Sequence, residues 1–232
     1  ENLSLETGVD ITQKEIVASR IAASGASWIF HFAATTDLDG AEKERSLGEQ
    51  SAAWRVNVEG TRHVVEAAKS GGKRVLYLST DFIFDGQSAP YTEESTPNPQ
   101  SWYALTKYEG EKFVANMGED GLIIRIAFPY KVGQAGREDF VHRVANRLRA
   151  GQQVETPKDQ LFMPTFIDDI ARVIQTLVSK QAWGVYHAVG SEAISPYDAA
   201  VLIARINGLD ESKVVPTTYI SYYKDRAPRP FH

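Results

Sequence analysis

The 232-residue sequence contains no cysteine. That absence excludes a disulfide framework, a thiolate nucleophile and a cysteine-ligated zinc site, and it fits a cytoplasmic protein. The formal net charge is −5 and no long run of Lys or Arg occurs, so the composition offers no basic surface for nucleic acid. No segment approaches the roughly 20 apolar residues of a membrane span. The composition therefore predicts a globular protein with neither a nucleic-acid nor a membrane partner.

The sequence also lacks the spacing of metal ligands. His63, His142 and His187 are scattered along the chain, so we predict no metal site. His31 lies inside an apolar run, where a hydrogen-bonded core histidine is a simpler interpretation than a catalytic one. Arg125 is interpreted as joining a strand to a loop. A solvated basic face, rather than a pocket for a nucleotide diphosphate, is the interpretation of four further arginines: Arg137, Arg143, Arg147 and Arg149.

Apolar runs of strand length alternate along the chain with helical patterns. The runs cover residues 28–34, 75–78, 122–126 and 185–189, and helical periodicity covers about 50–70, 102–117, 139–150, 170–178 and 196–205. Thr12 and Glu15 have the spacing of a helix capping box. The chain after residue 205 has no clear period and is predicted to be irregular. The alternation predicts an α/β fold with a largely parallel sheet and a change of texture near residue 130.

Three polar residues lie where such a fold would carry chemistry. Thr80 follows the apolar run at 75–78, and ligands of open α/β sheets bind at the carboxyl ends of strands. Tyr103 and Lys107 are four residues apart, about 40° around a helix, and so share a face. A nearby ammonium lowers the pKa of a phenol from its ordinary value of about 10. Tyr103 could then exchange a proton with a carbonyl oxygen that Thr80 also contacts.

The tyrosine–lysine spacing by itself is weak evidence, because Tyr108 and Lys112 also match it. A solvated helix face is the simpler interpretation of such a pair. Tyr103 differs from Tyr108 because it follows a Pro-bearing loop after the strand that ends at Thr80, whereas Tyr108 is rotated away by about 140°. None of the three groups carries a hydride, so carbonyl chemistry here requires a nicotinamide cofactor.

These residues and several further segments give the chain a resemblance to the extended short-chain dehydrogenases/reductases of the NAD-dependent epimerase/dehydratase superfamily. Within that group the chain is most similar to the dTDP-4-dehydrorhamnose reductase family. In chain order, the matching segments are HFAA (31–34), TDLDGAE (36–42), NVEGTR (57–62), LSTDFIFDG (78–86), PNP (97–99), GE (110–111), DQ (159–160), PT (164–165) and RP (229–230). The match covers nearly the whole chain.

The resemblance implies a Rossmann-like, doubly wound parallel sheet in residues 1–130. Residues 131–232 would form a smaller substrate-binding part, with 166–190 packing back on the sheet. It implies NAD or NADP as cofactor, a nucleotide-sugar as substrate and, at the level of the family, a homodimer. The implied catalytic residues are Thr80, Tyr103 and Lys107. The implied cofactor contacts are Asp10, Ile11, Phe32, Ala33, Ala34, Thr36, Ser79, Tyr103 and Lys107, and the implied substrate contacts are Asp81 and Phe128, the latter where the family often has Trp.

The glycine-rich turn with which the family begins does not precede Asp10, and Gly8 alone cannot replace it. The sequence starts at Glu1, without an initiator Met or a signal sequence. We expect that residues before Glu1 were removed or left out, because a parallel sheet without its first strand would expose buried edges. The alternative is a true short form that binds a dinucleotide poorly or not at all.

The predicted function is reduction of a 4-keto nucleotide-sugar such as dTDP-4-dehydro-L-rhamnose, with hydride transfer to C4 and Tyr103 as proton donor. A nucleotide-sugar epimerase on the same scaffold is an alternative. Dehydration needs a further acid–base pair, and Phe82 after Asp81 cannot exchange a proton. A further alternative is a non-catalytic subunit resembling the regulatory subunit of methionine adenosyltransferase. The sequence leaves open the choice of NAD or NADP, the sugar and base, and the oligomeric state.

Overall fold

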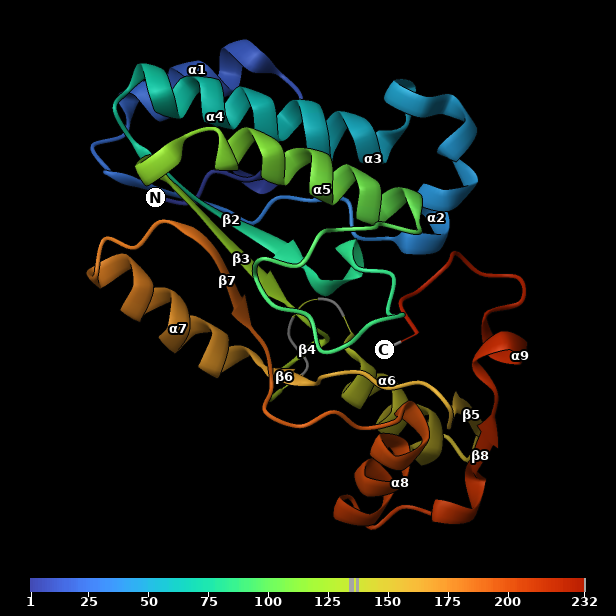
Figure 1. Ribbon diagram of the computed structural model, residues 1–232. Helices are drawn as coiled ribbons and strands as arrows, with labels where there is room; N and C mark the ends of the chain where they lie inside the picture. Colours follow the sequence, from blue (N-terminus) through green and yellow to red (C-terminus); the bar gives the residue numbers. More distant parts are fainter. Residues whose placement is uncertain (134–135, 137, 232) are drawn as a thin grey trace. The chain divides into compact units, whose positions relative to one another are not determined.

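The computed structural model describes residues 1–133, 136 and 138–231 (Figure 1). Contacts divide the chain into two compact units. Unit 1 comprises Glu1–Phe84, Tyr91–Arg125 and Leu177–His187, and unit 2 comprises Asp85–Pro90, Ile126–Thr176 and Ala188–His232. The chain crosses between the units in the loop after β2 (Arg74–Thr80), at the end of β3 (Gly121–Ile126), within α7 (Ile167–Ser179) and near the end of β7 (Gly184–Ala188).

Unit 1 is built on a four-stranded sheet in the order β1-β2-β3-β7. Its strands are β1 (Trp28–His31), β2 (Arg74–Thr80), β3 (Gly121–Ile126) and β7 (Gly184–Ala188). Strands β1 and β2 pair in parallel, with Trp28 opposite Arg74. The two central strands read as continuous apolar runs because both of their faces are covered, and their innermost side chains are fully buried.

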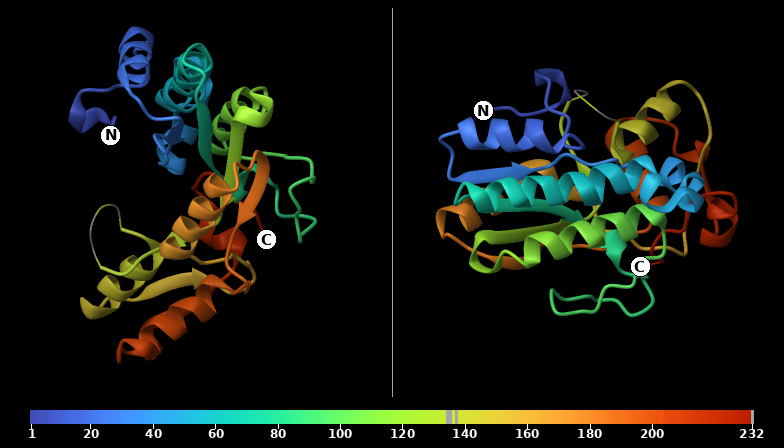
Figure 2. Two further views of the ribbon diagram at one scale, coloured as in Figure 1. Left: turned by 90° about the vertical axis from the view of Figure 1, so that its left-hand side faces the viewer. Right: turned by 90° about the horizontal axis from the view of Figure 1, so that it is seen from above.

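Helices α1 (Lys14–Ala23), α4 (Thr61–Ser70) and α5 (Trp102–Ala115) lie side by side over one face of this sheet (Figure 2). Val17 and Ile21 of α1 pack against Val64 of α4. The other side of α4 joins a second core cluster with side chains from the sheet and from α5: Val65, Ala68, Val75, Tyr77, Val114 and Ile123. The spacing of these apolar residues explains why the segments are helical, since each helix buries one face.

The predicted helix over about residues 50–70 is confirmed from Ala52 onward, with a π-helical turn inside it that was not predicted. After α2 (Leu38–Lys43) the chain forms a 3₁₀ segment, η2 (Arg45–Gln50), then the short helix α3 (Ala52–Trp54). A π-helical turn, η3 (Arg55–Gly60), then leads into α4. Periodicity cannot reveal such a turn, and π-turns are concentrated at functional sites.

The entry to α1 also differs from the prediction. Thr12 does not cap the helix, which begins after Gln13. Instead the backbone N–H and the hydroxyl of Thr12 both donate to Asp10 Oδ1, at 2.9 and 2.8 Å. Nearby, His63 Nδ1 donates to the carbonyl of Ile11 at 3.0 Å, and Ile11 packs against Gly60 where a Cβ would approach to 2.6 Å.

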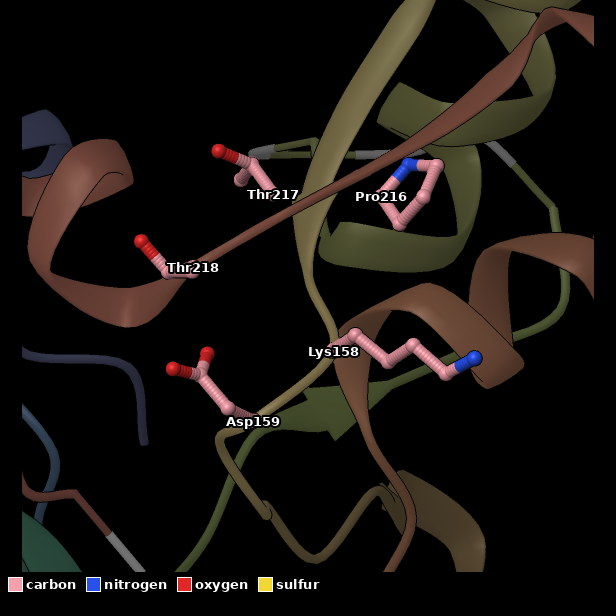
Figure 3. A pocket seen from close by; sticks show the side chains of 5 residues that line it. All are labelled: Lys158, Asp159, Pro216, Thr217 and Thr218. Carbon is pink, nitrogen blue, oxygen red and sulfur yellow. The ribbon is translucent and has the colours of Figure 1, made fainter.

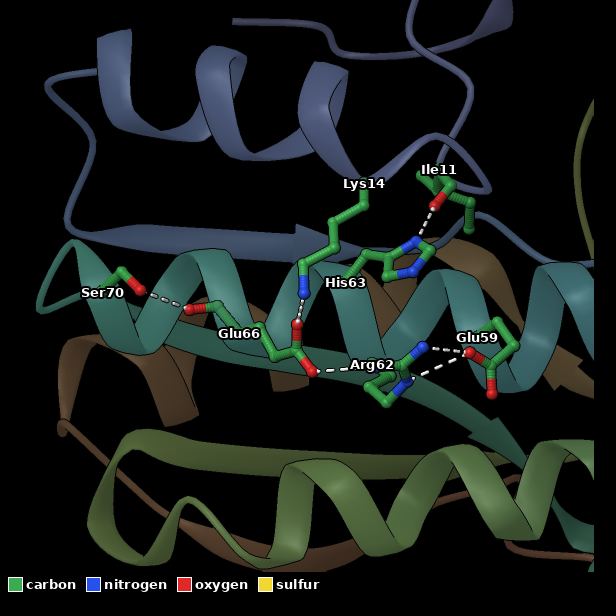
Figure 4. A network of polar contacts seen from close by, with 7 residues as sticks. All are labelled: Ile11, Lys14, Glu59, Arg62, His63, Glu66 and Ser70. Atoms are coloured by element: carbon green, nitrogen blue, oxygen red, sulfur yellow. Dashed lines mark hydrogen bonds and ion pairs between the residues drawn. The ribbon is translucent and has the colours of Figure 1, made fainter.

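The surface of α4 carries an ion-pair network (Figure 4). Arg62 pairs with Glu59 and Glu66, and Lys14 at the start of α1 reaches Glu66 at 2.8 Å. Pairs this exposed each contribute less than about 1 kcal/mol, and the Lys14–Glu66 pair is the member that joins α1 to α4.

Unit 2 contains two small parallel pairs of strands. Strand β4 (Pro129–Tyr130) pairs with β6 (Thr165–Phe166), and β5 (Val154–Pro157) pairs with β8 (Val214–Thr217). The prediction of an irregular tail is therefore wrong, because β8 and α9 (Tyr219–Tyr223) lie within it. Pairing between residues about sixty positions apart leaves no local signature in so short a strand.

The helices of unit 2 are α6 (Phe140–Arg149), α7 (Ile167–Ser179), which continues into unit 1, and α8 (Pro196–Ile206). Apolar side chains of α6 and α8 form the core with β5 and β8: Val144, Ala145, Leu148, Val154, Ala200, Ile203, Ala204 and Val214. Arg143, Arg147 and Arg149 are exposed, as predicted for a solvated basic face. Arg137 lies outside the described residues.

In the described part of the chain, none of the helices combines the length and the apolar character that crossing a bilayer requires.

Candidate active site at the end of strand β2

Strand β2 ends in Thr80, whose side chain is 8% exposed. The Thr80 hydroxyl donates to Asp81 Oδ1 at 3.2 Å and accepts from the backbone N–H of Phe82 at 3.3 Å. Burial raises the pKa of the Asp81 carboxyl to about 7, although the hydrogen bond from Thr80 acts in the opposite direction. Near neutral pH this carboxyl group can therefore both accept and donate protons.

Helix α5 begins next to this strand end and is anchored there by several polar contacts. Ser101 caps the helix by accepting from the N–H of Ala104 at 3.2 Å. Trp102 donates from its backbone to Glu42 at 2.7 Å and from its indole to Ser51 Oγ at 2.9 Å. These contacts fix the first turn of α5, which carries Tyr103.

Tyr103 is 7% exposed and belongs to a core cluster against which Phe82 packs. Its ring meets the ring of Phe82 edge to face, with the centroids 6.3 Å apart. Because Phe82 follows Thr80 by two residues, this contact brings Tyr103 to the same strand end as the Thr80 hydroxyl.

Lys107 lies one turn further along α5 and is 3% exposed. Its ammonium donates to the carbonyl of Leu78 at 2.8 Å and lies 3.9 Å from the centroid of the Tyr77 ring. Burial lowers the pKa of Lys107 to about 7, and the charge of Glu111 raises it by a smaller amount. Thr80 thus ends β2, Lys107 contacts Tyr77 and Leu78 of that strand, and Tyr103 contacts Phe82 two residues beyond it.

The second tyrosine–lysine pair has a different environment. Lys112 lies 4.7 Å from the centroid of the Tyr108 ring and forms an ion pair with Glu109 at 2.6 Å. The Lys112 side chain is half exposed. Tyr108 and Lys112 are thus on a solvated face, as predicted, and they serve as controls for the buried pair.

Asn57, in the π-helical turn η3, is a residue of the site that sequence reasoning did not single out. Its fully buried amide donates to the carbonyl of Thr35 at 3.1 Å and to Thr106 Oγ1 at 3.0 Å, and its Oδ1 accepts from Thr35 N–H at 2.8 Å. Thr106 in turn donates to the carbonyl of Tyr103 at 2.8 Å. Asn57 therefore joins the loop after β1 to the first turns of α5. Its only sequence signal is membership of the matching segment at 57–62.

His31 confirms the prediction of a hydrogen-bonded core histidine. Its Nε2 lies 2.9 Å from Thr61 Oγ1, which donates to the carbonyl of Asn57 at 2.7 Å. Burial, and to a smaller extent the charge of Lys107, lowers the pKa of His31 to about 3. The imidazole is therefore uncharged at neutral pH.

The residues predicted to contact a cofactor are distributed over two strand ends and one turn of unit 1. Phe32, directly after β1, is 53% exposed, and Ala33 and Thr36 are also exposed while Ala34 is half-buried. Asp10 and Ile11 are half-buried in the turn before α1. Ser79 is buried, and its Oγ has no hydrogen-bond partner among the described residues. A buried hydroxyl without a partner is rare and fits a site that a ligand completes.

Phe128, the predicted substrate contact in unit 2, has a left-handed backbone with φ of 39°. Such a conformation is unusual for a bulky residue and is a feature of constrained sites. Its ring meets Phe162 edge to face at 4.7 Å, and its carbonyl accepts from the N–H of Thr165 at 3.2 Å.

A cavity of about 370 Å³ in unit 2 is lined by Lys158, Asp159, Pro216, Thr217 and Thr218 (Figure 3). Two of its polar side chains are engaged within the protein, since Asp159 accepts from the N–H of Tyr219 at 2.6 Å and Thr218 caps α9. None of the predicted site residues lines it. Among the described residues, no group of three or more His, Asp or Glu side chains has the arrangement of a metal site.

Gly110 determines how closely α5 approaches β2. A Cβ on Gly110 would lie 2.6 Å from Tyr77 Oη and 2.7 Å from the carbonyl of Asn57. We expect Gly110→Ala to lower the free energy of unfolding by about 1–3 kcal/mol, although Ala is normally favoured over Gly inside a helix. Chemical denaturation of both proteins measures the change. Gly25→Ala is the control, because a Cβ there meets nothing within 4 Å, and equal losses in the two variants would contradict the prediction.

Comparison with known proteins identifies relatives over most of the chain. Residues 3–232 match the sequence family described as the RmlD substrate binding domain. A dTDP-4-dehydrorhamnose reductase from Aggregatibacter actinomycetemcomitans is 32% identical over 202 residues, which are 84% of this chain and 66% of that protein. The chain thus spans about two thirds of the length of that relative.

Solved structures of dTDP-4-dehydrorhamnose reductases also match most of the chain. A dTDP-4-dehydrorhamnose reductase from Clostridium acetobutylicum has a TM-score of 0.86 and 32% identity, and the match covers 97% of this chain and 76% of that one. The dTDP-4-dehydrorhamnose reductase from Bacillus anthracis, in complex with NADP, has a TM-score of 0.86 and 29% identity, covering 95% and 75% of the two chains. These likenesses confirm the predicted Rossmann-like α/β fold.

Proposed function

The chain belongs to the RmlD substrate binding domain family, as its predicted resemblance implied, and from that premise we propose that it is a reductase of 4-keto nucleotide-sugars that uses NADH or NADPH. The observation that carries the proposal is the burial of Tyr103 and Lys107, one helical turn apart, against the strand end that Thr80 occupies. Burial of an ammonium is unfavourable. A lysine without a function in the site would therefore be expected on the solvated face of the helix.

The nicotinamide cofactor, when bound, supplies the hydride that reduces C4 of the sugar. Tyr103 donates its phenolic proton to the ketone oxygen as that oxygen gains negative charge, and the product is an alcohol. The Lys107 ammonium stabilises the tyrosinate that remains, and solvent returns the proton to it. Thr80 donates a hydrogen bond to the same oxygen.

Asp81 controls which acceptor receives the single hydroxyl proton of Thr80. In the structure that proton points to Asp81 Oδ1. When the Asp81 carboxyl is protonated, it can donate to the Thr80 oxygen, and Thr80 is then free to donate to the ketone. The raised pKa of Asp81, about 7, makes this protonated form available near neutral pH.

The cofactor contacts follow from the same strand ends. The unpartnered Ser79 hydroxyl would offer a hydrogen bond to the cofactor, and Phe32, Ala33, Ala34 and Thr36 after β1 would contact it. Asp10 and Ile11 would hold the adenine. The NADP bound to the Bacillus anthracis reductase supports NADPH as the first cofactor to test. Phe128 and Asp81 contact the sugar.

The test is an assay of the protein with NADH and with NADPH against several 4-keto nucleotide-sugars, including dTDP-4-dehydro-L-rhamnose. Stoichiometric oxidation of the cofactor, with deuterium from deuterated nicotinamide appearing at C4 of the sugar, is the expected result. Interconversion of sugars with a retained cofactor and no net oxidation would indicate an epimerase instead. Absence of both activities, together with copurification of a larger enzyme, would indicate a regulatory subunit.

A further inference from the structure

Lys107 is a buried cation that lies against the face of an aromatic ring. Its side chain is almost fully buried, yet none of the ion pairs that the described residues form includes it. The contacts of its ammonium are one backbone carbonyl, that of Leu78 at 2.8 Å, and the face of the Tyr77 ring at 3.9 Å. An ammonium within about 6 Å of an aromatic centroid is attracted to the negative face of the ring, most strongly where water is excluded.

We propose that Tyr77 is a positioning residue for the reaction: the face of its ring holds the Lys107 ammonium in place and in its charged form. The inference rests on the proposed function, because Lys107 matters for turnover only if it assists Tyr103. Tyr77 touches neither substrate nor cofactor in this proposal and acts through Lys107.

The Tyr77 ring is fixed in the core and cannot turn away from the ammonium. The residue is fully buried in β2, and its hydroxyl donates to the backbone carbonyl of Lys107 at 3.3 Å. Gly110 allows the backbone of α5 to pass directly over the Tyr77 hydroxyl. Tyr77 therefore contacts Lys107 twice, at the carbonyl through its hydroxyl and at the ammonium through its ring.

The other charged and titratable groups around Lys107 leave the Tyr77 ring a role in stabilising the ammonium. On its own helix Glu111 favours the ammonium, but Glu111 is itself paired with Arg125 of β3 at 2.8 Å. From β1, His31 is uncharged because its pKa is about 3, and it stacks at a tilt against Tyr77 with the ring centroids 5.4 Å apart. From β2 come the Tyr77 ring and the Leu78 carbonyl. Burial already brings the pKa of Lys107 down to about 7, so small losses of cation stabilisation change its charge at physiological pH.

The experiment compares Tyr77→Phe with variants that carry phenylalanines of increasing ring fluorination at the same position. Fluorine withdraws charge from the ring face and leaves the shape of the side chain nearly unchanged, so the fold is kept. The titration of the Lys107 side chain is followed by NMR with isotope-labelled lysine, and Lys107→Met assigns the signal. We expect Tyr77→Phe to titrate close to the natural protein and the most fluorinated ring to lower the midpoint by about one pH unit.

A matched control uses the exposed pair. The same fluorinated residues at Tyr108, whose ring contacts Lys112, are expected to leave the Lys107 midpoint unchanged. Equal Lys107 midpoints for the phenylalanine and the fluorinated rings at position 77 would overturn the proposal and reduce Tyr77 to a packing residue.

Turnover supplies the second readout and separates the two proposals. If Lys107 assists Tyr103, the alkaline limb of the kcat profile moves to lower pH together with the Lys107 midpoint, while KM for the sugar at pH values well below the midpoint stays constant. A midpoint that moves in a protein without reductase activity would support the role of Tyr77 and contradict the proposed function. Reductase activity in a protein whose Lys107 midpoint does not move would support the proposed function and contradict the role of Tyr77.

Discussion

Replacing Tyr103 with phenylalanine is expected to lower kcat for ketone reduction by about 10²- to 10⁴-fold, the usual contribution of a positioned proton donor. The variant loses only a hydroxyl group. Its ring keeps the edge-to-face contact with Phe82, and the Thr106 hydroxyl still donates to the backbone carbonyl of residue 103. Residual turnover should come from orientation of the sugar and from the Thr80 hydrogen bond. Steady-state kcat, with circular dichroism to check the fold, measures the loss.

Tyr108→Phe is the matched control for this experiment. It removes the same atom from the same helix, on a face where Lys112 is half exposed, and should leave kcat unchanged. A Tyr103→Phe variant that retains full turnover would remove Tyr103 from the reaction. A large loss of kcat in both variants would instead indicate that helix α5 does not tolerate loss of a phenol for structural reasons.

The candidate site could be found in the sequence because its three residues obey local rules. An apolar run that stops at Thr80 marks a buried strand end, and a separation of four residues places Tyr103 and Lys107 on one helix face. Both rules depend only on the repeat of the backbone, so they hold without knowledge of the tertiary structure. The roles given to these residues remain predictions until turnover is measured.

The residues that support the site could not be found in the same way, because their partners are distant in sequence. Asn57 contacts Thr35 and Thr106 across 22 and 49 positions, and it lies in a π-helical turn that periodicity does not distinguish from the rest of the predicted helix. In the sequence pattern, Tyr77 cannot be distinguished from the other apolar residues of its strand. Nothing in a sequence period indicates that an ammonium lies on its face.

Local rules also fail when two of them compete for one side chain. Thr12 has capping-box spacing with Glu15, but Asp10 lies two residues before it and accepts both of its donors. Aspartate commonly closes such a turn, and the helix then begins one residue later. The capping-box spacing of Thr12 and Glu15 is present in the sequence, but Thr12 bonds to Asp10 and does not cap α1.

Breaking the ion pair between Arg125 and Glu111 is expected to give the largest loss of stability. Both side chains are almost fully buried, and the guanidinium donates to the carboxylate at 3.1 and 2.8 Å, joining β3 to α5. Arg125→Met leaves the Glu111 carboxylate buried without its cation. We expect the free energy of unfolding to fall by about 3–5 kcal/mol. Chemical denaturation measures the loss, and Arg62→Met, in an exposed network, should cost less than about 1 kcal/mol.

The double variant Arg125→Met, Glu111→Leu distinguishes the cost of an unpaired charge from the value of the pair. With both charges removed, much of the stability lost in Arg125→Met should return, because no buried ion is left uncompensated. The charge of Glu111 raises the pKa of Lys107, so the double variant should titrate Lys107 at lower pH, while the single variant, which frees Glu111 from its partner, should titrate it at higher pH. Stability and the Lys107 midpoint therefore move in opposite directions along this series. A double variant no more stable than Arg125→Met would contradict the explanation and assign the loss to packing around the arginine side chain.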